Sequence, residues 1–272
     1  MLQLDGSKHD WFEGKRDKAV LMSFIDDATG FIFSRFYEYE GTIPAMSLLK
    51  QYTEEYGLPM SIYSDKHTTY KSTDKNKEAL SQFGRALEEL GIELIHANTP
   101  QAKGRVERSF RTLQDRLVKE MRLKNIRGIE TANNFLKQYL PVFNSKFNVI
   151  PFDNADVNIK IDKTVNLDDY LCIKQERTVK NDNTISYNSK LYQLEPGIRA
   201  KKVTIEEHID GSVHIKYNGA SLKYKEIIKR PAKITEKVIK IRKKYIPPAD
   251  HPWRQSFNKY FKHKTLQTAD EK

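Results

Sequence analysis

The chain is poor in cysteine and has no long hydrophobic run. Cys172 is the only cysteine among 272 residues, which excludes an internal disulfide and a CxxC metal motif. No apolar stretch approaches the roughly 20 residues that a membrane-spanning helix needs, and no signal-type segment opens the chain. We therefore expect a soluble, cytoplasmic protein in a reducing compartment, with Cys172 buried as a small apolar side chain.

Negative charge is also scarce relative to positive charge. The chain has 47 Lys and Arg against 36 Asp and Glu, a formal net charge of +11, and 38% of its residues are apolar, enough for a substantial core. A basic protein of this kind favours a polyanionic partner. Nucleic acid is the leading candidate, and a membrane surface is the rival one.

Residues 1–125 combine strand and helix patterns in a clear order. The predicted elements are strands at 2–5, 19–25 and 31–37, a helix at 42–56, a strand ending at 65, a helix at 78–90, a strand at 92–95 and a helix after 99. The loop between the second and third strands ends in glycine, which is typical of a hairpin. The order predicts an α/β protein in which three antiparallel strands precede alternating helices and parallel strands.

The last of these helices has the strongest hydrophobic period. Thr99 suits the N-cap position and Pro100 the first helical position, where a missing amide hydrogen costs nothing. Glu107 lies about 100° round the helix from its apolar neighbour, at an edge that can face a cleft. A single buried stripe is predicted at Val106, Phe110, Leu113, Leu117 and Met121.

Three carboxylates occupy positions typical of a two-metal phosphoryl-transfer site. Asp5 and Asp65 close short apolar runs of strand type, and Glu107 lies in the first turns of the helix. Two ions about 3.5–4 Å apart can activate a water or a 3′ hydroxyl and stabilise the leaving oxygen. Hard oxygen ligands favour Mg²⁺, with Mn²⁺ as a substitute. We predict that these three residues are catalytic and bind two metal ions.

Basic side chains accompany Glu107 on the same segment. Lys103, Arg105, Arg108 and Arg111 surround it in sequence, and such side chains position DNA through its phosphates. We predict that these four contact DNA. The alternative is a solvated basic helix that carries an ordinary surface glutamate.

Other polar side chains near these positions have simpler explanations. Aspartates in a hairpin loop are ordinarily turn residues, and carboxylates far down a helix face solvent. Histidines near the motif aspartates could orient DNA or water, but a solvent-facing role is the more common one. We assign no catalytic role to Asp10, Glu13, Asp26, Asp27, Asp115, Glu120, His9 and His67.

The rest of the chain divides into three parts by pattern. Residues 126–172 predict a helical connector, with a helix at 131–139 that Pro141 interrupts. Residues 173–230 contain short alternating strands separated by Asp-Gly and Asn-Gly turns, which predicts a small β-barrel. Residues 231–272 have 11 Lys and Arg against 4 Asp and Glu, which is typical of a basic, partly disordered tail.

Four segments together resemble a known family. QLDGSKHDWFEG, FIDDATG, YSDKHTTY and QAKGRVERSFRTLQDRLVKE are similar to the integrase catalytic core of DDE transposases, most closely the ISNCY group of bacterial insertion sequences. The resemblance covers residues 1 to about 220. It implies a ribonuclease H-like core with a mixed five-stranded sheet, and two-metal attack of a 3′ hydroxyl on DNA phosphates. It also implies a homo-oligomer on DNA, with Asp5, Asp65 and Glu107 as metal ligands.

One departure from the family concerns the N-terminal side. Such transposases carry a helix-turn-helix region ahead of the catalytic core, whereas here Met1 lies four residues before Asp5. We therefore expect a truncated form. The leading hypothesis is DNA strand cleavage and strand transfer in integration and transposition. The alternative is a catalytically inert DNA-binding remnant that acts through its basic barrel and tail; a ribonuclease H acting on RNA in hybrids is disfavoured by the GRVER helix and the appended barrel.

Overall fold

The fold is described from a computed structural model of the chain. It describes residues 1–15, 19–64, 80–96, 104–153, 157–162, 164–195, 200–228, 246–248 and 250–252, without the side chains of residues 104 and 105. The chain divides into two compact units, Met1–Arg230 and Pro231–Lys272. The predicted basic tail coincides with the second unit, and most of it lies outside the described residues.

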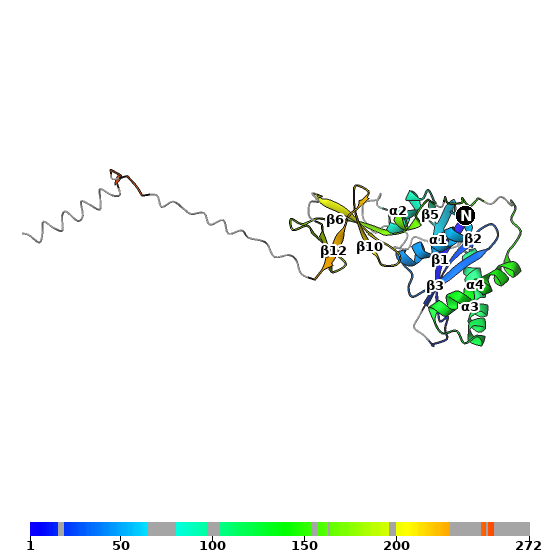
Figure 1. Ribbon diagram of the computed structural model, residues 1–272. Helices are drawn as coiled ribbons and strands as arrows, with labels where there is room; N and C mark the ends of the chain where they lie inside the picture. Colours follow the sequence, from blue (N-terminus) through cyan, green and yellow to red (C-terminus); the bar gives the residue numbers. More distant parts are fainter. Residues whose placement is uncertain are drawn as a thin grey trace, which may run out of the picture. The chain divides into compact units, whose positions relative to one another are not determined.

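The first unit opens with a mixed five-stranded sheet in the order β3-β2-β1-β4-β5 (Figure 1). Strands β1, β2 and β3 are antiparallel, while β4 is parallel to β1 and β5 is parallel to β4. This confirms the predicted α/β class and matches the sheet expected for a ribonuclease H-like core. The strands are β1 (Leu2–His9), β2 (Ala19–Asp26), β3 (Ile32–Tyr37), β4 (Ser61–Ser64) and β5 (Glu93–His96).

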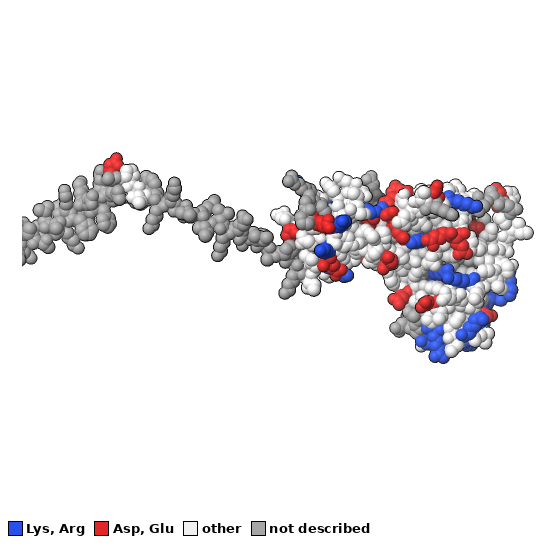
Figure 2. Space-filling view, viewed as in Figure 1, with Lys and Arg blue, Asp and Glu red and all other residues white. Residues whose placement is uncertain are grey.

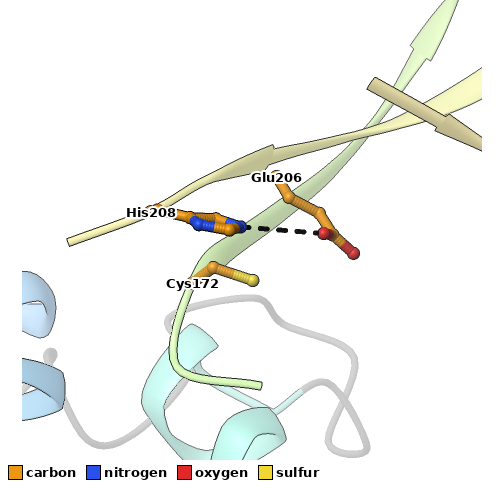
Figure 3. A group of neighbouring side chains, drawn as sticks. All are labelled: Cys172, Glu206 and His208. Carbon is orange, nitrogen blue, oxygen red and sulfur yellow. Dashed lines mark ion pairs between the residues drawn. The ribbon is translucent and has the colours of Figure 1, made fainter. Parts of the chain in front are cut away.

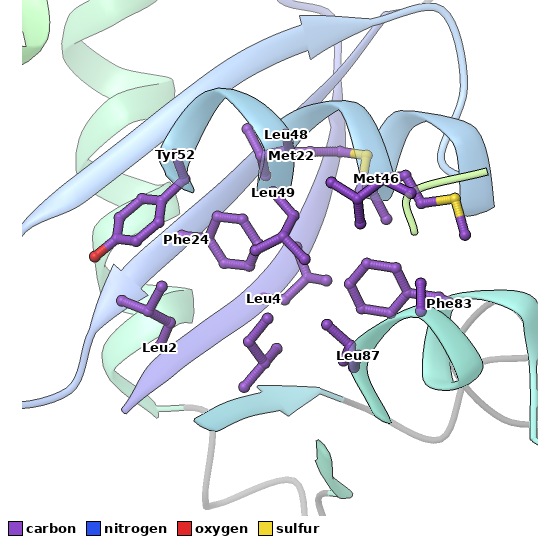
Figure 4. Packing of buried hydrophobic residues seen from close by; sticks show 14 of the residues in the cluster. Leu2, Leu4, Met22, Phe24, Met46, Leu48, Leu49, Tyr52, Phe83 and Leu87 are labelled. Carbon is purple, nitrogen blue, oxygen red and sulfur yellow. The ribbon is translucent and has the colours of Figure 1, made fainter. Parts of the chain in front are cut away.

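Helices cover both faces of this sheet. Helices α1 (Thr42–Tyr56) and α2 (Gln82–Glu89) pack on one face, in a core that Figure 4 shows from close by. Helices α3 (Gly104–Leu123) and α4 (Ile129–Phe147) bury a second cluster on the other face. Alternate strand residues serve the two cores because successive side chains point to opposite faces. In the described part of the chain, no helix is long and apolar enough to cross a membrane.

Strand β1 is longer than the sequence predicts. The apolar run ends at Leu4, but the strand continues to His9 because each residue pairs with one on β2, from Leu2 opposite Asp26 to His9 opposite Ala19. Asp5 therefore lies inside the strand, opposite Ser23, and not at its end. The pairing partner, which a local pattern cannot reveal, determines this length.

Helix α4 continues through Pro141 to Phe147, so the predicted interruption is wrong. Proline removes one intrahelical hydrogen bond, but contacts with the sheet hold the helix on both sides of it. Asn144 exchanges two hydrogen bonds with the backbone of Ile32 on β3, both at 2.9 Å. Asn133 does the same with Phe36, at 2.7 and 3.0 Å.

The part after Cys172 forms two small sheets. Strands β11-β10-β9-β6 make one and β12-β8-β7 the other, around a cluster that includes Ile185, Tyr192 and Ile205. No closed barrel is found in residues 173–195 and 200–228, because β8 pairs with β7 on one side and β12 on the other, and neither β7 nor β8 pairs with β6 or β9. The strands are β6 (Ile173–Thr178), β7 (Thr184–Tyr187), β8 (Lys190–Leu194), β9 (Lys202–Glu207), β10 (Val213–Tyr217), β11 (Ala220–Ser221) and β12 (Tyr224–Ile227).

Candidate active site

The alternation along β1 places Asp5 on the face of the sheet that carries α3. Leu2 and Leu4 belong to the core beneath α1 and α2, so the odd-numbered residues Gln3, Asp5 and Ser7 point the other way. Ser7, two residues beyond Asp5, contacts α3 directly: Gln114 donates from Nε2 to Ser7 Oγ at 3.0 Å. The half-buried Asp5 therefore faces the α3 side.

Two contacts determine the direction of α3 along β1. Gln114 meets Ser7 in the strand, and Arg122, eight residues further along the helix, pairs with Glu13 beyond the strand end at 2.6 Å. The helix thus runs in the same direction as β1. Glu107 lies seven residues before Gln114, about 10.5 Å along the axis, and Asp5 lies about 7 Å along the strand before Ser7. Both carboxylates therefore lie on the same side of the contact between Gln114 and Ser7, toward the N-terminal ends of α3 and β1.

Strand β4 leads to the third predicted carboxylate. Ile62 and Tyr63 lie beside Leu2 and Gln3 of β1 in parallel register, and β4 ends at Ser64. Asp65 is the next residue in the chain, but it lies outside the described residues. The structure therefore brings Asp5 and Glu107 to one side of the sheet, and the placement of Asp65 remains a prediction.

Helix α3 separates a buried stripe from a basic outer surface. Glu107, Arg108 and Arg111 are exposed. Among the described residues, the ion pairs made by α3 join Lys119 to Asp115 and Arg122 to Glu13 and leave Arg108 and Arg111 without a carboxylate. Lys103 and the side chain of Arg105 lie outside the described residues. The predicted stripe is confirmed as buried: Val106, Phe110, Leu113, Leu117 and Met121.

Positive side chains also gather on the molecular surface around this helix. In Figure 2, Lys and Arg collect at the end of the sheet-bearing part where Figure 1 places α3 and α4. Asp and Glu gather mainly toward the region of α1. On the side seen in Figure 2, the end that carries α3 and α4 therefore has the positive charge that suits a polyanion.

The other acidic residues of the first strands have local partners. Asp26 accepts from the amide and the hydroxyl of Thr29 at 3.0 and 2.6 Å, which is turn chemistry. Asp27 accepts from Gln3 at 2.7 Å. Asp10 accepts from the amide of Gly14 at 2.9 Å. These contacts agree with the structural roles assigned to them.

Two histidines, His9 and His67, lie near the motif aspartates in the sequence. His9 is exposed at the end of β1, and its ring lies edge-on to Trp11 with centroids 5.2 Å apart. His67 lies outside the described residues. His9 therefore has the solvent-facing position that its sequence context favours.

Sequence reasoning missed the hydrogen bond that joins the two catalytic candidates' elements. Gln114 follows Glu107 by seven residues, and Ser7 follows Asp5 by two. Those spacings place each polar residue on the same face as its carboxylate. The two periods were visible, but nothing local indicated that the helix and the strand would meet there.

Cys172 is fully buried, as predicted. Burial, followed by the charge of the nearby Glu206, raises the pKa of its thiol to about 11. The side chain is therefore protonated at neutral pH, which excludes it as a ready nucleophile.

Comparisons with known proteins give two curated relatives. The putative transposase y4bF of Sinorhizobium fredii (strain NBRC 101917 / NGR234) is 37% identical over 235 residues, covering 83% of this chain and 51% of the relative. The transposase for insertion sequence IS1202 of Streptococcus pneumoniae is 31% identical over 288 residues, covering 100% and 61%. The chain thus spans about half to three-fifths of the length of these relatives.

No family model matches the chain. The crystal structure of the catalytic core domain of BIV integrase is similar with a TM-score of 0.41 and 20% identity, covering 55% of this chain and 86% of that one.

Proposed function

Because this chain is a homologue of bacterial transposases over most of its length, we propose that it carries the catalytic region of a DNA transposase. The reaction is cleavage of a DNA strand followed by attack of the freed 3′ hydroxyl on a target phosphate. Asp5, Asp65 and Glu107 are the catalytic carboxylates. No covalent enzyme intermediate is required, because positioning and charge stabilisation provide most of the rate enhancement.

The observation that supports this proposal best is the direction of α3. The contacts of Gln114 with Ser7 and of Arg122 with Glu13 make the helix run with β1. Glu107, in the first turn, therefore lies on the same side of the contact between Gln114 and Ser7 as Asp5 does. A helix that ran the opposite way would carry Glu107 away from Asp5, so the orientation is a specific requirement of the reaction.

The donor atoms fit a hard divalent cation. Carboxylate oxygens of Asp5 and Glu107 are the ligand type that Mg²⁺ prefers, and one exposed and one half-buried carboxylate leave room for retained waters. When bound, two such ions supply electrophilic stabilisation of the attacking and leaving oxygens. Strand β1 holds Asp5 through its pairing with β2, and the buried stripe of α3 holds the helix that presents Glu107.

DNA is the proposed substrate, and Arg108 and Arg111 are proposed to hold its phosphates. Both side chains are exposed on the turns next to Glu107, where a phosphate approaching the carboxylates would pass. Lys103 and Arg105 are proposed to join them. Because joining two element ends to a target needs two active sites, we extend the proposal to a homo-oligomer on DNA.

The test is metal-dependent strand cleavage and joining on a branched DNA that mimics the joined product. This substrate demands little recognition of an element end. With Mg²⁺ or Mn²⁺, the unmodified chain should turn the substrate over, whereas Asp5→Asn and Glu107→Gln should abolish turnover and leave DNA binding intact. Glu120→Gln is the matched control, because it removes an exposed carboxylate from the same helix.

Three outcomes would contradict the proposal. Absence of turnover by a folded protein that binds DNA would indicate an inert DNA-binding protein. Turnover that survives Glu107→Gln would assign the activity to other residues. Equal loss in Glu107→Gln and Glu120→Gln would point to a general effect of charge on the helix.

A further inference from the structure

A cluster of three different metal-ligating side chains lies in the small β part, distinct from the candidate active site. Cys172 immediately precedes β6, Glu206 lies in β9, and His208 follows β9 (Figure 3). The sulfur, one carboxylate oxygen and one ring nitrogen all lie within 4.8 Å of one another. The pairing of Ile173 with Glu207 brings these segments together.

Two members of the cluster are buried, and the half-buried His208 is unsatisfied. Cys172 is 0% exposed and Glu206 is 4% exposed. Within the described part of the chain, the buried Nε2 of His208 has no hydrogen-bond partner. It lies 3.9 Å from Glu206 Oε2, the contact drawn in Figure 3. His214 stacks on the His208 ring at a centroid distance of 4.3 Å and an interplanar angle of 30°, which holds the ring in this orientation.

We propose that Cys172, Glu206 and His208 bind a divalent cation of borderline softness, of which Zn²⁺ is the representative. Cysteine sulfur, histidine nitrogen and glutamate oxygen are each donors that zinc takes in proteins, and three protein ligands leave the fourth position to water. The same donors differ from the all-oxygen set of Asp5 and Glu107, so the two sites select different metals.

The three ligand atoms need to move only a short distance toward one another to surround a zinc ion. Ligands at about 2.0–2.3 Å from a tetrahedral zinc ion lie roughly 3.3–3.7 Å from each other. The His208 to Glu206 distance of 3.9 Å is close to that range, and the remaining separations close by rotation of the side chains. On binding, the thiol of Cys172 exchanges its proton for the metal, and the proton passes to solvent.

Lys216 would compete with a metal ion for Glu206, but it also pairs with a second carboxylate. Its Nζ lies 2.8 Å from Glu206 Oε2 and also 2.8 Å from Asp169 Oδ1. When Glu206 turns to the metal, Lys216 keeps Asp169. Lys174, 4.0 Å from Glu206, likewise keeps Glu89 at 2.8 Å. Neither lysine is therefore left as an unpaired charge.

Co²⁺ replaces Zn²⁺ as a spectroscopic probe in the test. The full chain, freed of metal by a chelator, is titrated with Co²⁺ and then with Zn²⁺. We expect one equivalent of Co²⁺ to produce a sulfur-to-cobalt charge-transfer band, which Zn²⁺ then displaces. Zn²⁺ should also raise the thermal unfolding temperature, since a ligand that binds only the folded state stabilises it.

Cys172→Ser should abolish the band, and His208→Asn should weaken Co²⁺ and Zn²⁺ binding at least about tenfold. His214→Phe is the matched control: it keeps a stacked ring and should leave the affinity unchanged. Glu107→Gln should also leave the band unchanged, which separates this site from the proposed catalytic one.

Two results would overturn the proposal. One is the absence of a charge-transfer band in the folded, metal-loaded chain. The other is equal Zn²⁺ affinity in the unmodified chain, Cys172→Ser and His208→Asn. Either would show that the cluster is a metal-free polar network. Circular dichroism of each variant establishes that it is folded, and the two independent ligand substitutions keep the result decisive if one variant fails to fold.

Discussion

Gln114 on α3 donates a hydrogen bond to Ser7 on β1, with 3.0 Å between Nε2 and Oγ. Each of these residues lies on the same face of its element as a proposed catalytic carboxylate, Glu107 and Asp5 respectively. The bond therefore ties the helix that carries one carboxylate to the strand that carries the other. It is a positioning contact at a distance from the proposed chemistry.

Gln114→Ala should reduce strand joining more than it reduces stability. The lost hydrogen bond costs about 1 kcal/mol of unfolding free energy, whereas a displacement of Glu107 by about 1 Å lowers the joining rate by roughly 10- to 100-fold. Urea unfolding and the branched-DNA assay measure the two effects. In the double-mutant cycle with Ser7→Ala, we expect a coupling of about 0.5–1.5 kcal/mol; strictly additive effects would show that the bond does not position α3.

Asn144→Ala should destabilise the protein strongly without touching the proposed site. Asn144 is buried and satisfies both the amide and the carbonyl of Ile32 on the edge strand β3. Its loss leaves two backbone groups unpaired, at about 1–3 kcal/mol each, and exposes part of a sheet edge to self-association. Urea unfolding should show a loss of about 2 kcal/mol or more, and light scattering should show aggregation.

Asn148→Ala is the control for that measurement, because Asn148 is an exposed asparagine just after the same helix. It should change stability by less than about 0.5 kcal/mol. A similar loss in both variants would mean that the bonds to Ile32 contribute little.

The ion pairs of Glu89 should stabilise the folded protein at neutral pH, and this stabilisation should be lost in acid. Glu89 lies 2.8 Å from Lys174 and 2.9 Å from Arg85. Burial acts to raise its pKa, but the hydrogen bonds from Lys174 and Arg85 outweigh burial and hold the pKa below the usual range. The folded state therefore binds this proton less readily than the unfolded state. The stabilisation is present above the unfolded pKa and is lost as the pH falls through the folded one.

Glu89→Gln should accordingly lower the unfolding free energy at pH 7, by about 0.2–1 kcal/mol since the group is partly exposed. The difference from the unmodified chain should shrink as the pH falls below the usual titration range of a glutamate carboxyl and through the lowered folded-state pKa of Glu89. Denaturant unfolding at several pH values measures it, with the exposed neighbour Glu88→Gln as the control. A difference that does not change with pH would rule out the ion pairs as its source.

Arg111→Ala should weaken DNA binding in a salt-dependent way. Arg111 is exposed and has no carboxylate partner among the described residues, so it is available to a phosphate. Losing one phosphate contact reduces the slope of log K against log salt by about 1. Arg122→Ala is the control, because Arg122 already pairs with Glu13 at 2.6 Å. If both substitutions change the slope equally, α3 has no preferred DNA-binding end.

The local pattern determined most of the secondary structure. The helix predicted at 42–56 matches α1, and the short strands predicted within residues 173–230 are present as β6 to β12. Hydrophobic period and turn residues are local properties of the sequence, so they predict secondary structure even when the fold is not known. The Asn218-Gly219 turn is an example: both residues adopt positive φ, 48° and 80°, as the dipeptide predicts. The order of elements likewise determined the α/β class.

Tertiary structure decided what depends on partners distant in sequence. Strand β1 extends to His9 because β2 pairs with it, and α4 continues through Pro141 while Asn133 and Asn144 bond to β3. The seven late strands make two sheets because of which strands pair. The contact between Gln114 and Ser7, which sets the direction of α3, joins residues more than 30 positions apart. The cluster of Cys172 and Glu206 does so too. Such contacts form only when the chain packs, since burial and hydrogen bonding between distant segments have no local pattern.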